Sequence, residues 1–200
     1  LGANGVVGDT TNVKDCKRII QKTEKENGPI QILICNVGSG KSVKIGHETN
    51  KEWKRVLDIN LFSSVNMVDA LVKYSKSKKI SVICISSICG HEIIPGAPIT
   101  YSVAKSALNF YVKSYADYLY SKNIRINTVS PGNLLFRGSV WEKKMIKEKS
   151  LVKKTLSSVT INRLGNVKEI YSVIKFLSSE NSSFVIGQNL IVDGGQTKSI

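Results

Sequence analysis

Short apolar runs rich in β-branched residues recur along the chain, and the segments between them have apolar residues at helical spacing. The runs lie at residues 5–8, 30–35, 80–86, 124–129 and 189–192. Runs of this length predict buried strands, and strands that alternate with helices predict an α/β fold with a mostly parallel sheet. We expect one domain over residues 1–200, because a chain of this length can bury one sizeable core.

Two of the helices are predicted in detail from their end signals. The first begins after Asn12 and ends at Gly28, which a proline follows. The last begins after Asn166, a residue suited to capping, with Glu169 three residues later. Residues expected on the buried faces of these two helices are Val13, Cys16, Ile19, Ile20, Ile170, Val173, Ile174 and Leu177.

Residues 133–164 break the alternation, because this stretch between a strand and the last helix has no clear period. Long irregular loops in compact domains are usually lids, binding loops or disordered segments, and we expect a substrate lid here. The segment also carries the densest group of basic residues in the chain. These are Lys143, Lys144, Lys147, Lys149, Lys153 and Lys154, against Glu142 and Glu148.

The formal net charge of +14 allows two interpretations. The lysines are spread over solvated helix faces, or they attract an anionic partner such as nucleic acid or a phosphorylated substrate. Nucleic acid ranks last, because no recognition helix or mixture of aromatic and basic residues stands out. No membrane partner is expected, since the apolar runs are shorter than the roughly 18–20 residues of a membrane span.

The cysteines and histidines do not form the spacings typical of disulfide frameworks or metal sites. Cys16, Cys35, Cys84 and Cys89 are expected to be reduced thiols, which are typical of a cytoplasmic protein. His47 and His91 lack metal-ligand spacing, so no metal is expected.

The glycine-rich stretch "CNVGSGKS" at residues 35–42 follows a predicted strand and suggests a phosphate-binding loop. A P-loop requires G-x-x-x-x-G-K-[ST], but Cys35 occupies the first glycine position. The dinucleotide pattern G-x-G-x-x-G fails too, because Val43 stands where the third glycine would be. The stretch must therefore be interpreted from its neighbours, and Ser42 is expected only to begin an exposed loop.

A tyrosine and a lysine four residues apart project from one face of a helix, and the ammonium lowers the pKa of the phenol. The spacing occurs four times here, so it is weak evidence by itself. Tyr101 and Lys105 stand out, because Ser87 closes a predicted strand 14 residues earlier. Catalytic groups in open parallel sheets gather at the carboxyl ends of strands. The other pairs are Tyr74/Lys78, Tyr118/Lys122 and Tyr171/Lys175.

Five ordered motifs resemble those of the short-chain dehydrogenase/reductase family. They are "CNVG", "LDINLF", "ISSICG…TYSVAKSAL", "INTVSPG" and "INRLGNVKEIYSVIKFLSSENSSFVIGQNLIVDGG". The resemblance runs almost from end to end and implies a Rossmann-like, doubly wound parallel sheet. It also implies an NAD- or NADP-dependent oxidoreductase that interconverts a carbonyl and a secondary alcohol, and it suggests a homotetramer or homodimer.

The resemblance implies a role for each matched residue. Tyr101 would be the general acid or base on the substrate oxygen, and Ser87 would hydrogen-bond that oxygen. Lys105 would lower the pKa of Tyr101 and bind the nicotinamide ribose, while Asn60 would anchor a water relay to Lys105. Residues matched to the cofactor site are Asp9, Thr10, Asn36, Val37, Gly38, Tyr101, Lys105, Pro131, Gly132 and Leu134.

The chain departs from the family pattern in three places. The family's first strand, glycine-rich turn and second strand have no counterpart, so we expect the first two strands of the fold to be missing and about 50–60 residues to precede Leu1 in a longer protein. Phe136 stands where the family often has a threonine, and the loop between Ser87 and Tyr101 is one residue longer. NAD and NADP stay open, because the residue that distinguishes them would lie in the missing part.

The stretch "SPGNLLFRGSVWEKK" resembles bacterial reductases of sugar and surface-glycan pathways. With the basic lid, it favours an anionic sugar or nucleotide sugar as the substrate, whose phosphate the lysines would bind. Two alternatives stay open. A 3-oxoacyl-[acyl-carrier-protein] reductase would use the same lysines to dock an acidic carrier, and a nicotinamide-binding subunit would keep the fold without catalysis.

Overall fold

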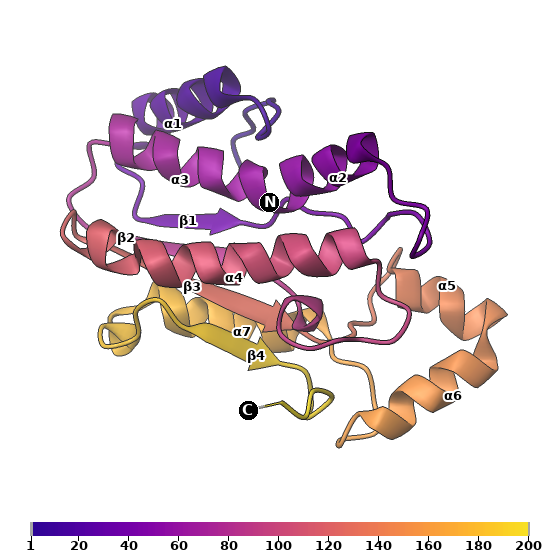
Figure 1. Cartoon of the computed structure of the whole chain (residues 1–200). Helices are drawn as coiled ribbons and strands as arrows, with labels where there is room; N and C mark the ends of the chain where they lie inside the picture. Colours follow the sequence, from indigo (N-terminus) through magenta and orange to yellow (C-terminus); the bar gives the residue numbers. More distant parts are fainter. Residues whose placement is uncertain (1, 200) are drawn as a thin grey trace.

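The computed structural model describes residues 2–199, and these form a four-stranded parallel sheet with helices on both faces (Figure 1). The strands are β1 (Ile32–Cys35), β2 (Ile80–Ile85), β3 (Ile124–Pro131) and β4 (Asn189–Val192), in that spatial order. The helices are α1 (Val13–Asn27), α2 (Asn50–Leu57), α3 (Ser63–Tyr74), α4 (Ile99–Tyr120), α5 (Val140–Lys147), α6 (Lys149–Ser158) and α7 (Val167–Ser178). A π-helical turn, η1 (Asp58–Phe62), joins α2 to α3, and short 3-10 turns form η2 (Ile88–Gly90) and η3 (Glu180–Ser182).

Side chains along the strands alternate between two hydrophobic cores, because successive residues of a strand point to opposite faces. On β2, Val82 and Cys84 pack in the core formed with α1, α3 and α4. Ile83 packs in the second core, with Ile170 and Leu177 of α7. The sheet is therefore covered on both faces, and the predicted doubly wound α/β fold is confirmed.

The first helix begins and ends where the sequence predicts. The Asn12 side chain accepts hydrogen bonds from two backbone amides of the first turn of α1, and Gly28 caps the other end with φ 84°. Cys16 and Ile20 are buried as expected, but Val13 is 63% exposed, so its predicted burial is wrong. The first helical turn contributes only Cys16 to the core, and Val13 lies in solvent beside the cap.

The last helix confirms its predicted capping. The Asn166 side chain accepts from the Lys168 and Glu169 amides, and the Glu169 carboxylate accepts from the Asn166 amide. This reciprocal pair satisfies amides that a helix leaves without a partner. Ile170 and Leu177 are then buried against the sheet.

The strand predicted at residues 5–8 does not form, although the other four predicted strands do. The segment has no regular secondary structure, and Val7 is 91% exposed. The Arg18 guanidinium holds it by donating to the Val7 carbonyl at 2.7 Å. A strand requires a hydrogen-bonded neighbour, and among residues 2–199 none pairs with this segment, because β1 pairs with β2 alone.

The interval 133–164 is not an irregular loop, because it contains α5 and α6. The Ser139 side chain caps α5 by accepting from the Glu142 amide. The sequence of this interval has weak apolar periodicity because α5 buries none of its residues and α6 buries only Val152.

Within the described part of the chain, no helix combines the length and the apolar character that a membrane span requires.

Replacing Ile20 by alanine is expected to lower the free energy of unfolding by about 2–5 kcal/mol, because it leaves a cavity between α1 and α3. The matched control is Val13→Ala on the same helix, which should change that free energy by less than about 0.5 kcal/mol. Urea unfolding followed by circular dichroism measures both values. Equal effects of the two substitutions would contradict the placement of α1.

Candidate active site

The candidate active site lies where β2 ends and α4 begins. After Ile85 the chain leaves the sheet through Ser86 and Ser87, and the Ser87 hydroxyl accepts from the Cys89 amide at 3.2 Å. The next turn packs closely on α4, since a Cβ on Gly90 would lie 2.5 Å from the backbone carbonyl carbon of Lys105. Only glycine allows this approach, which brings the loop that follows β2 against the first turns of α4.

Tyr101 and Ser87 meet as the sequence predicts, although they are 14 residues apart. Burial raises the pKa of Tyr101 above its ordinary value, and a hydrogen bond with the Ser87 hydroxyl opposes that rise. The phenol is therefore protonated at neutral pH and lies beside a second hydroxyl. This pair is suited to donating a proton, and a hydrogen bond, to one oxygen atom.

Lys105 places a buried ammonium beneath the tyrosine. Its side chain is 3% exposed, its Nζ donates to the Ile85 carbonyl at 2.8 Å, and Nζ lies 5.9 Å from the centre of the Tyr101 ring. Burial lowers the pKa of Lys105 to about 8, and the neighbouring thiols of Cys84 and Cys35 oppose this shift. The bond to Ile85 uses one of the three ammonium protons, so two remain for other acceptors.

Asn60 fixes the loop that follows β1 to the helical layer. It is fully buried in the π-helical turn η1, a feature that recurs at functional sites. Its Oδ1 accepts from the Ser39 amide at 2.8 Å, and its Nδ2 donates to the carbonyls of Ser39 and Val56, both at 3.0 Å. The side chain thus holds backbone, and the predicted water relay to Lys105 stays a prediction.

The residues around Gly38 fit the close approach of a nicotinamide cofactor. A Cβ at this position would lie 3.0 Å from Oδ1 of Asn60 and 3.3 Å from Nζ of Lys105. Glycine therefore leaves open the space that faces both side chains, and Asn36 and Val37 beside it are exposed. A ribose hydroxyl in that space would meet an ammonium with two free protons.

Thr10 reaches the same end of β1 from the N-terminal segment. It lines a cavity of ≈ 80 Å³ at the end of β1, together with Asn36 and Val37. The Asn66 side chain holds the Thr10 carbonyl at 3.2 Å. The neighbouring Asp9 is exposed, and its carboxylate accepts from the Thr11 amide and hydroxyl, both at 2.8 Å. The cofactor roles of Asp9 and Thr10 stay predictions.

Pro131, Gly132 and Leu134 lie at the end of β3, next to β4. The Gly132 amide donates to the Val192 carbonyl at 3.0 Å, and a Cβ on Gly132 would be 2.7 Å from Cβ of Asp193. Leu134 forms a bridge with Gly165 and packs against the second core. These contacts hold the end of β3 against β4, and the cofactor roles of the three residues stay predictions.

Sequence reasoning missed Ser42, which is not a simple exposed loop residue. Its hydroxyl donates to Oε1 of Glu52 at 2.9 Å and lies 2.7 Å from the Thr100 hydroxyl. The signal in the sequence was slight: a serine in a glycine-rich turn and a glutamate in the first turn of the next helix. Nothing local in the sequence indicates that residue 100 meets residue 42.

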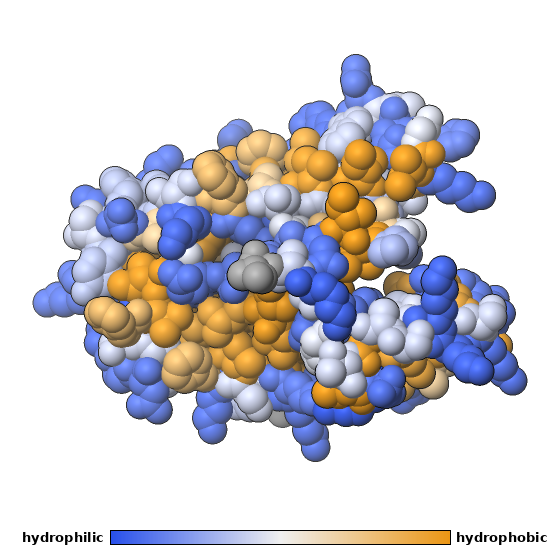
Figure 2. Space-filling view, turned by 60° about the horizontal axis from the view of Figure 1, so that its bottom comes forward, coloured by the Kyte–Doolittle hydropathy of each residue, from blue (hydrophilic) through white to orange (hydrophobic). Residues whose placement is uncertain are grey.

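The carboxyl ends of the strands, α5 and α6 all lie on the right in Figure 1. The space-filling view, turned about the horizontal axis, shows the surface hollowed at its right edge, with apolar side chains along the hollow (Figure 2).

Among the described residues, no group of three or more His, Cys, Asp or Glu side chains could hold a metal ion.

Comparisons with known proteins identify relatives over nearly the whole chain. A family described as "Enoyl-(Acyl carrier protein) reductase" matches residues 1–197. The rat "Dehydrogenase/reductase SDR family member 4" is 31% identical over 199 residues, which are 98% of this chain and 69% of that protein. The "3-oxoacyl-[acyl-carrier-protein] reductase FabG" of Thermotoga maritima is 30% identical over 188 residues, 94% of this chain and 74% of that protein.

A solved structure has the same fold. The ligand-free aldohexose dehydrogenase of Thermoplasma acidophilum superposes with a TM-score of 0.87 at 27% sequence identity. The match covers 98% of this chain and 79% of that one. The chain is therefore similar to dehydrogenases and reductases in both sequence and structure.

Replacing Lys105 by methionine is expected to change how stability depends on pH. The folded-state pKa of about 8 lies below the ordinary 10.5, so between these values the unfolded chain binds more protons and stability rises with pH. The wild type should gain up to about 3 kcal/mol relative to K105M across this window. Urea unfolding at pH values below and within the window measures it, and parallel pH profiles of the two proteins would contradict the burial of this ammonium.

Proposed function

The chain belongs to the short-chain dehydrogenase/reductase family of NAD(P)-dependent oxidoreductases, and we propose that it interconverts a carbonyl and a secondary alcohol on an anionic substrate. The observation that supports this most is the meeting of Ser87, Tyr101 and Lys105 at the carboxyl end of β2. A protein that only binds the cofactor has no need of a buried phenol paired with a hydroxyl and an ammonium.

Each of these side chains has a distinct part in the proposed reaction. Bound nicotinamide supplies or accepts the hydride. In reduction the Tyr101 hydroxyl donates a proton to the carbonyl oxygen, and in oxidation the phenolate takes the proton from the alcohol. The Ser87 hydroxyl donates a hydrogen bond to the same oxygen, which stabilises charge that develops there.

Lys105 stabilises the phenolate that Tyr101 becomes after giving up its proton. At neutral pH the ammonium is charged, because its pKa of about 8 lies above that pH. A positive charge near the ring favours the ionised phenol. Asn60 supports this pair by holding the backbone of Ser39, and the neighbouring Gly38 lies against Lys105.

The lysines of α5 and α6 support an anionic sugar or nucleotide sugar as the substrate. The Lys144 ammonium lies 4.9 Å from the centre of the Trp141 ring, whose Nε1 donates to Asn133 at 3.0 Å. Through Trp141, Lys144 is therefore held close to Asn133, in the loop at the end of β3. A sugar substrate also agrees with the aldohexose dehydrogenase to which the chain is similar. The lysines would bind a phosphate as point charges.

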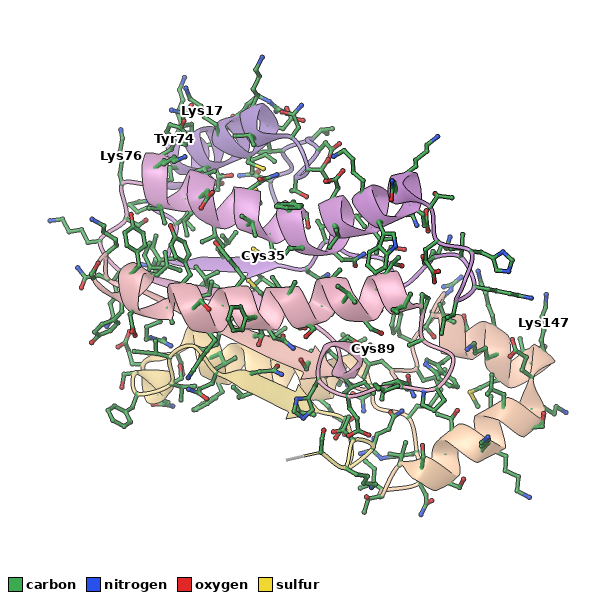
Figure 3. All side chains as sticks on the ribbon, viewed as in Figure 1. Lys17, Cys35, Tyr74, Lys76, Cys89 and Lys147 are labelled. Atoms are coloured by element: carbon green, nitrogen blue, oxygen red, sulfur yellow. The ribbon has the colours of Figure 1, made fainter. Side chains whose placement is uncertain are left out.

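A second candidate is a 3-oxoacyl-[acyl-carrier-protein] reductase. Curated relatives with that name include those of Thermotoga maritima and Buchnera aphidicola. Lys147 lies at the outer edge of the molecule in Figure 3, and Met145 and Ile146 beside it are exposed. An outward-facing basic and apolar helix suits an acidic protein carrier better than it suits a small sugar.

We also propose that the enzyme is a cytoplasmic homodimer or homotetramer. The outer face of α4 exposes Val103, Phe110 and Tyr118, and α3 is preceded by exposed Phe62. Apolar residues gathered on adjoining helices are typical of surfaces between protein subunits. The four cysteines are free, which agrees with a reducing compartment.

Replacing Tyr101 by phenylalanine is expected to lower kcat by at least about 100-fold, because the proton donor is lost, while the Kd for NAD or NADP changes little. Tyr118→Phe is the matched control. Tyr118 also precedes a lysine by four residues, and the Lys122 ammonium lies 5.7 Å from its ring centre, but the ring is exposed and remote from Ser87. Turnover above half of the wild-type rate in Y101F would exclude Tyr101 as the acid.

Neutralising Lys143, Lys144 and Lys147 together by glutamine is expected to raise KM for a phosphorylated sugar about tenfold, with little change for the neutral sugar. The control replaces Lys14, Lys17 and Lys22 of α1, which changes the net charge equally on another surface. A rise seen only with a thioester on an acidic carrier protein, and not with the free thioester, would favour the second candidate. Unchanged KM values for every anionic substrate would remove the proposed role of these lysines.

A further inference from the structure

We propose that Ser42 is a positioning residue, which holds the first turn of α4, and with it Tyr101, in register with the loop that follows β1. The inference rests on the proposed function, because it concerns the same acid. It adds Ser42 and Thr100 to the residues on which the reaction depends, and both act through the placement of Tyr101.

The hydroxyl of Ser42 lies between two partners from different elements. It donates to Oε1 of Glu52 in the first turn of α2 at 2.9 Å. Its oxygen lies 2.7 Å from Oγ1 of Thr100, so the hydroxyl of Thr100 donates to Ser42 when Ser42 donates to Glu52. One serine therefore links α2, the loop after β1 and the start of α4.

The Glu52 end of this link is fixed by charge. The Arg55 guanidinium donates to both carboxylate oxygens of Glu52, from Nε at 2.8 Å and from one terminal nitrogen at 2.7 Å. The same terminal nitrogen also donates to the Lys41 carbonyl at 2.9 Å. The hydrogen bonds from Arg55 and then Ser42 lower the pKa of Glu52 to about 2. Glu52 therefore stays ionised throughout the working pH range and remains a strong acceptor for Ser42.

The Thr100 end is fully buried and has a particular need for this bond. Thr100 is 0% exposed, and a buried hydroxyl without a partner is unfavourable. Pro98 is the N-cap residue of α4, and in the described structure it makes no side-chain capping bond. The first turn of α4 therefore depends on contacts from outside the helix, and Tyr101 is the next residue after Thr100.

The same loop is held on its other side by the active site. Ser39 is bonded twice to Asn60, and Gly38 lies against Lys105. Between Gly38 and Ser42 the loop thus spans the distance from the ammonium of Lys105 to the residue before Tyr101. A shift of the helix start by a fraction of an ångström would alter the bond between Tyr101 and Ser87, and misplacement of reacting groups is costly in rate.

The test compares S42A and T100V with two references. T100S keeps the hydroxyl and is expected to restore wild-type behaviour. S75A is the matched control, because the Ser75 hydroxyl also bonds a glutamate, Glu24, but between α1 and the end of α3. We expect S42A and T100V each to lower kcat on the order of tenfold with little change in cofactor KM. The double variant should be no worse than S42A alone, since both single substitutions remove the bond between Ser42 and Thr100.

The ionisation of Tyr101 supplies a readout that does not need turnover. Loss of the Ser87 hydrogen bond, which lowers the pKa of Tyr101, would move its titration to higher pH. The ultraviolet absorbance of tyrosinate, measured as the difference between each protein and its Y101F counterpart, reports this titration. We expect an upward shift in S42A and T100V, and none in S75A or T100S. The rising limb of the pH profile of alcohol oxidation, which depends on the phenolate, should shift in the same direction.

The outcomes separate the two proposals. If the wild type turns over no carbonyl or alcohol with either cofactor, yet the titration shifts as described, the proposed function fails and the positioning role stands. If the wild type is active but S42A and T100V match S75A in kcat and in titration, the positioning role is overturned. Multiplicative losses in the double variant would also overturn it.

Discussion

The buried ammonium of Lys105 is the point at which the sheet, the helical layer and the loops meet. Its bond to the Ile85 carbonyl ties α4 to the end of β2, and burial of this charge lowers its pKa to about 8. Gly38 and Gly90 approach the same residue from two loops, with no side chain between. A charge kept from water needs a fixed and polar surrounding, and the loops supply it.

This arrangement sets opposite pKa shifts on two neighbouring groups. Burial raises the pKa of the Tyr101 phenol and lowers that of the Lys105 ammonium, because it disfavours the charged form of each group, and the two pKa values move apart. A phenol that is protonated at neutral pH can donate a proton, and a nearby ammonium favours the phenolate that forms when the proton leaves. The Ser87 hydroxyl adds a bond to the phenol side of the pair. The electrostatics therefore follow from the fold and need no charge brought from elsewhere.

Features set by neighbours in the sequence could be predicted, and features set by distant segments could not. The caps at Asn12 and Asn166 follow from local amide geometry, and the buried strands follow from their apolar runs. The meeting of Ser87 and Tyr101 was predicted because the ends of parallel strands share one edge. Residues 5–8 were misassigned, since a strand also needs a partner, and α5 was missed because it buries no face. The bond from Ser42 to Thr100 depends on the complete fold.

The contact of Gly90 with α4 limits how the loop between β2 and α4 can diverge among related proteins. A side chain at residue 90 would force the backbone of Lys105 to move, so the first turn of the loop is tied to the helix. Residues 93–97 lie beyond that contact and carry no polar side chain, so their length and chemistry can vary more readily. Sequence changes in residues 93–97 can therefore alter the surface of this loop without moving Tyr101 or Lys105, so the loop can diverge while the proton donor stays in place.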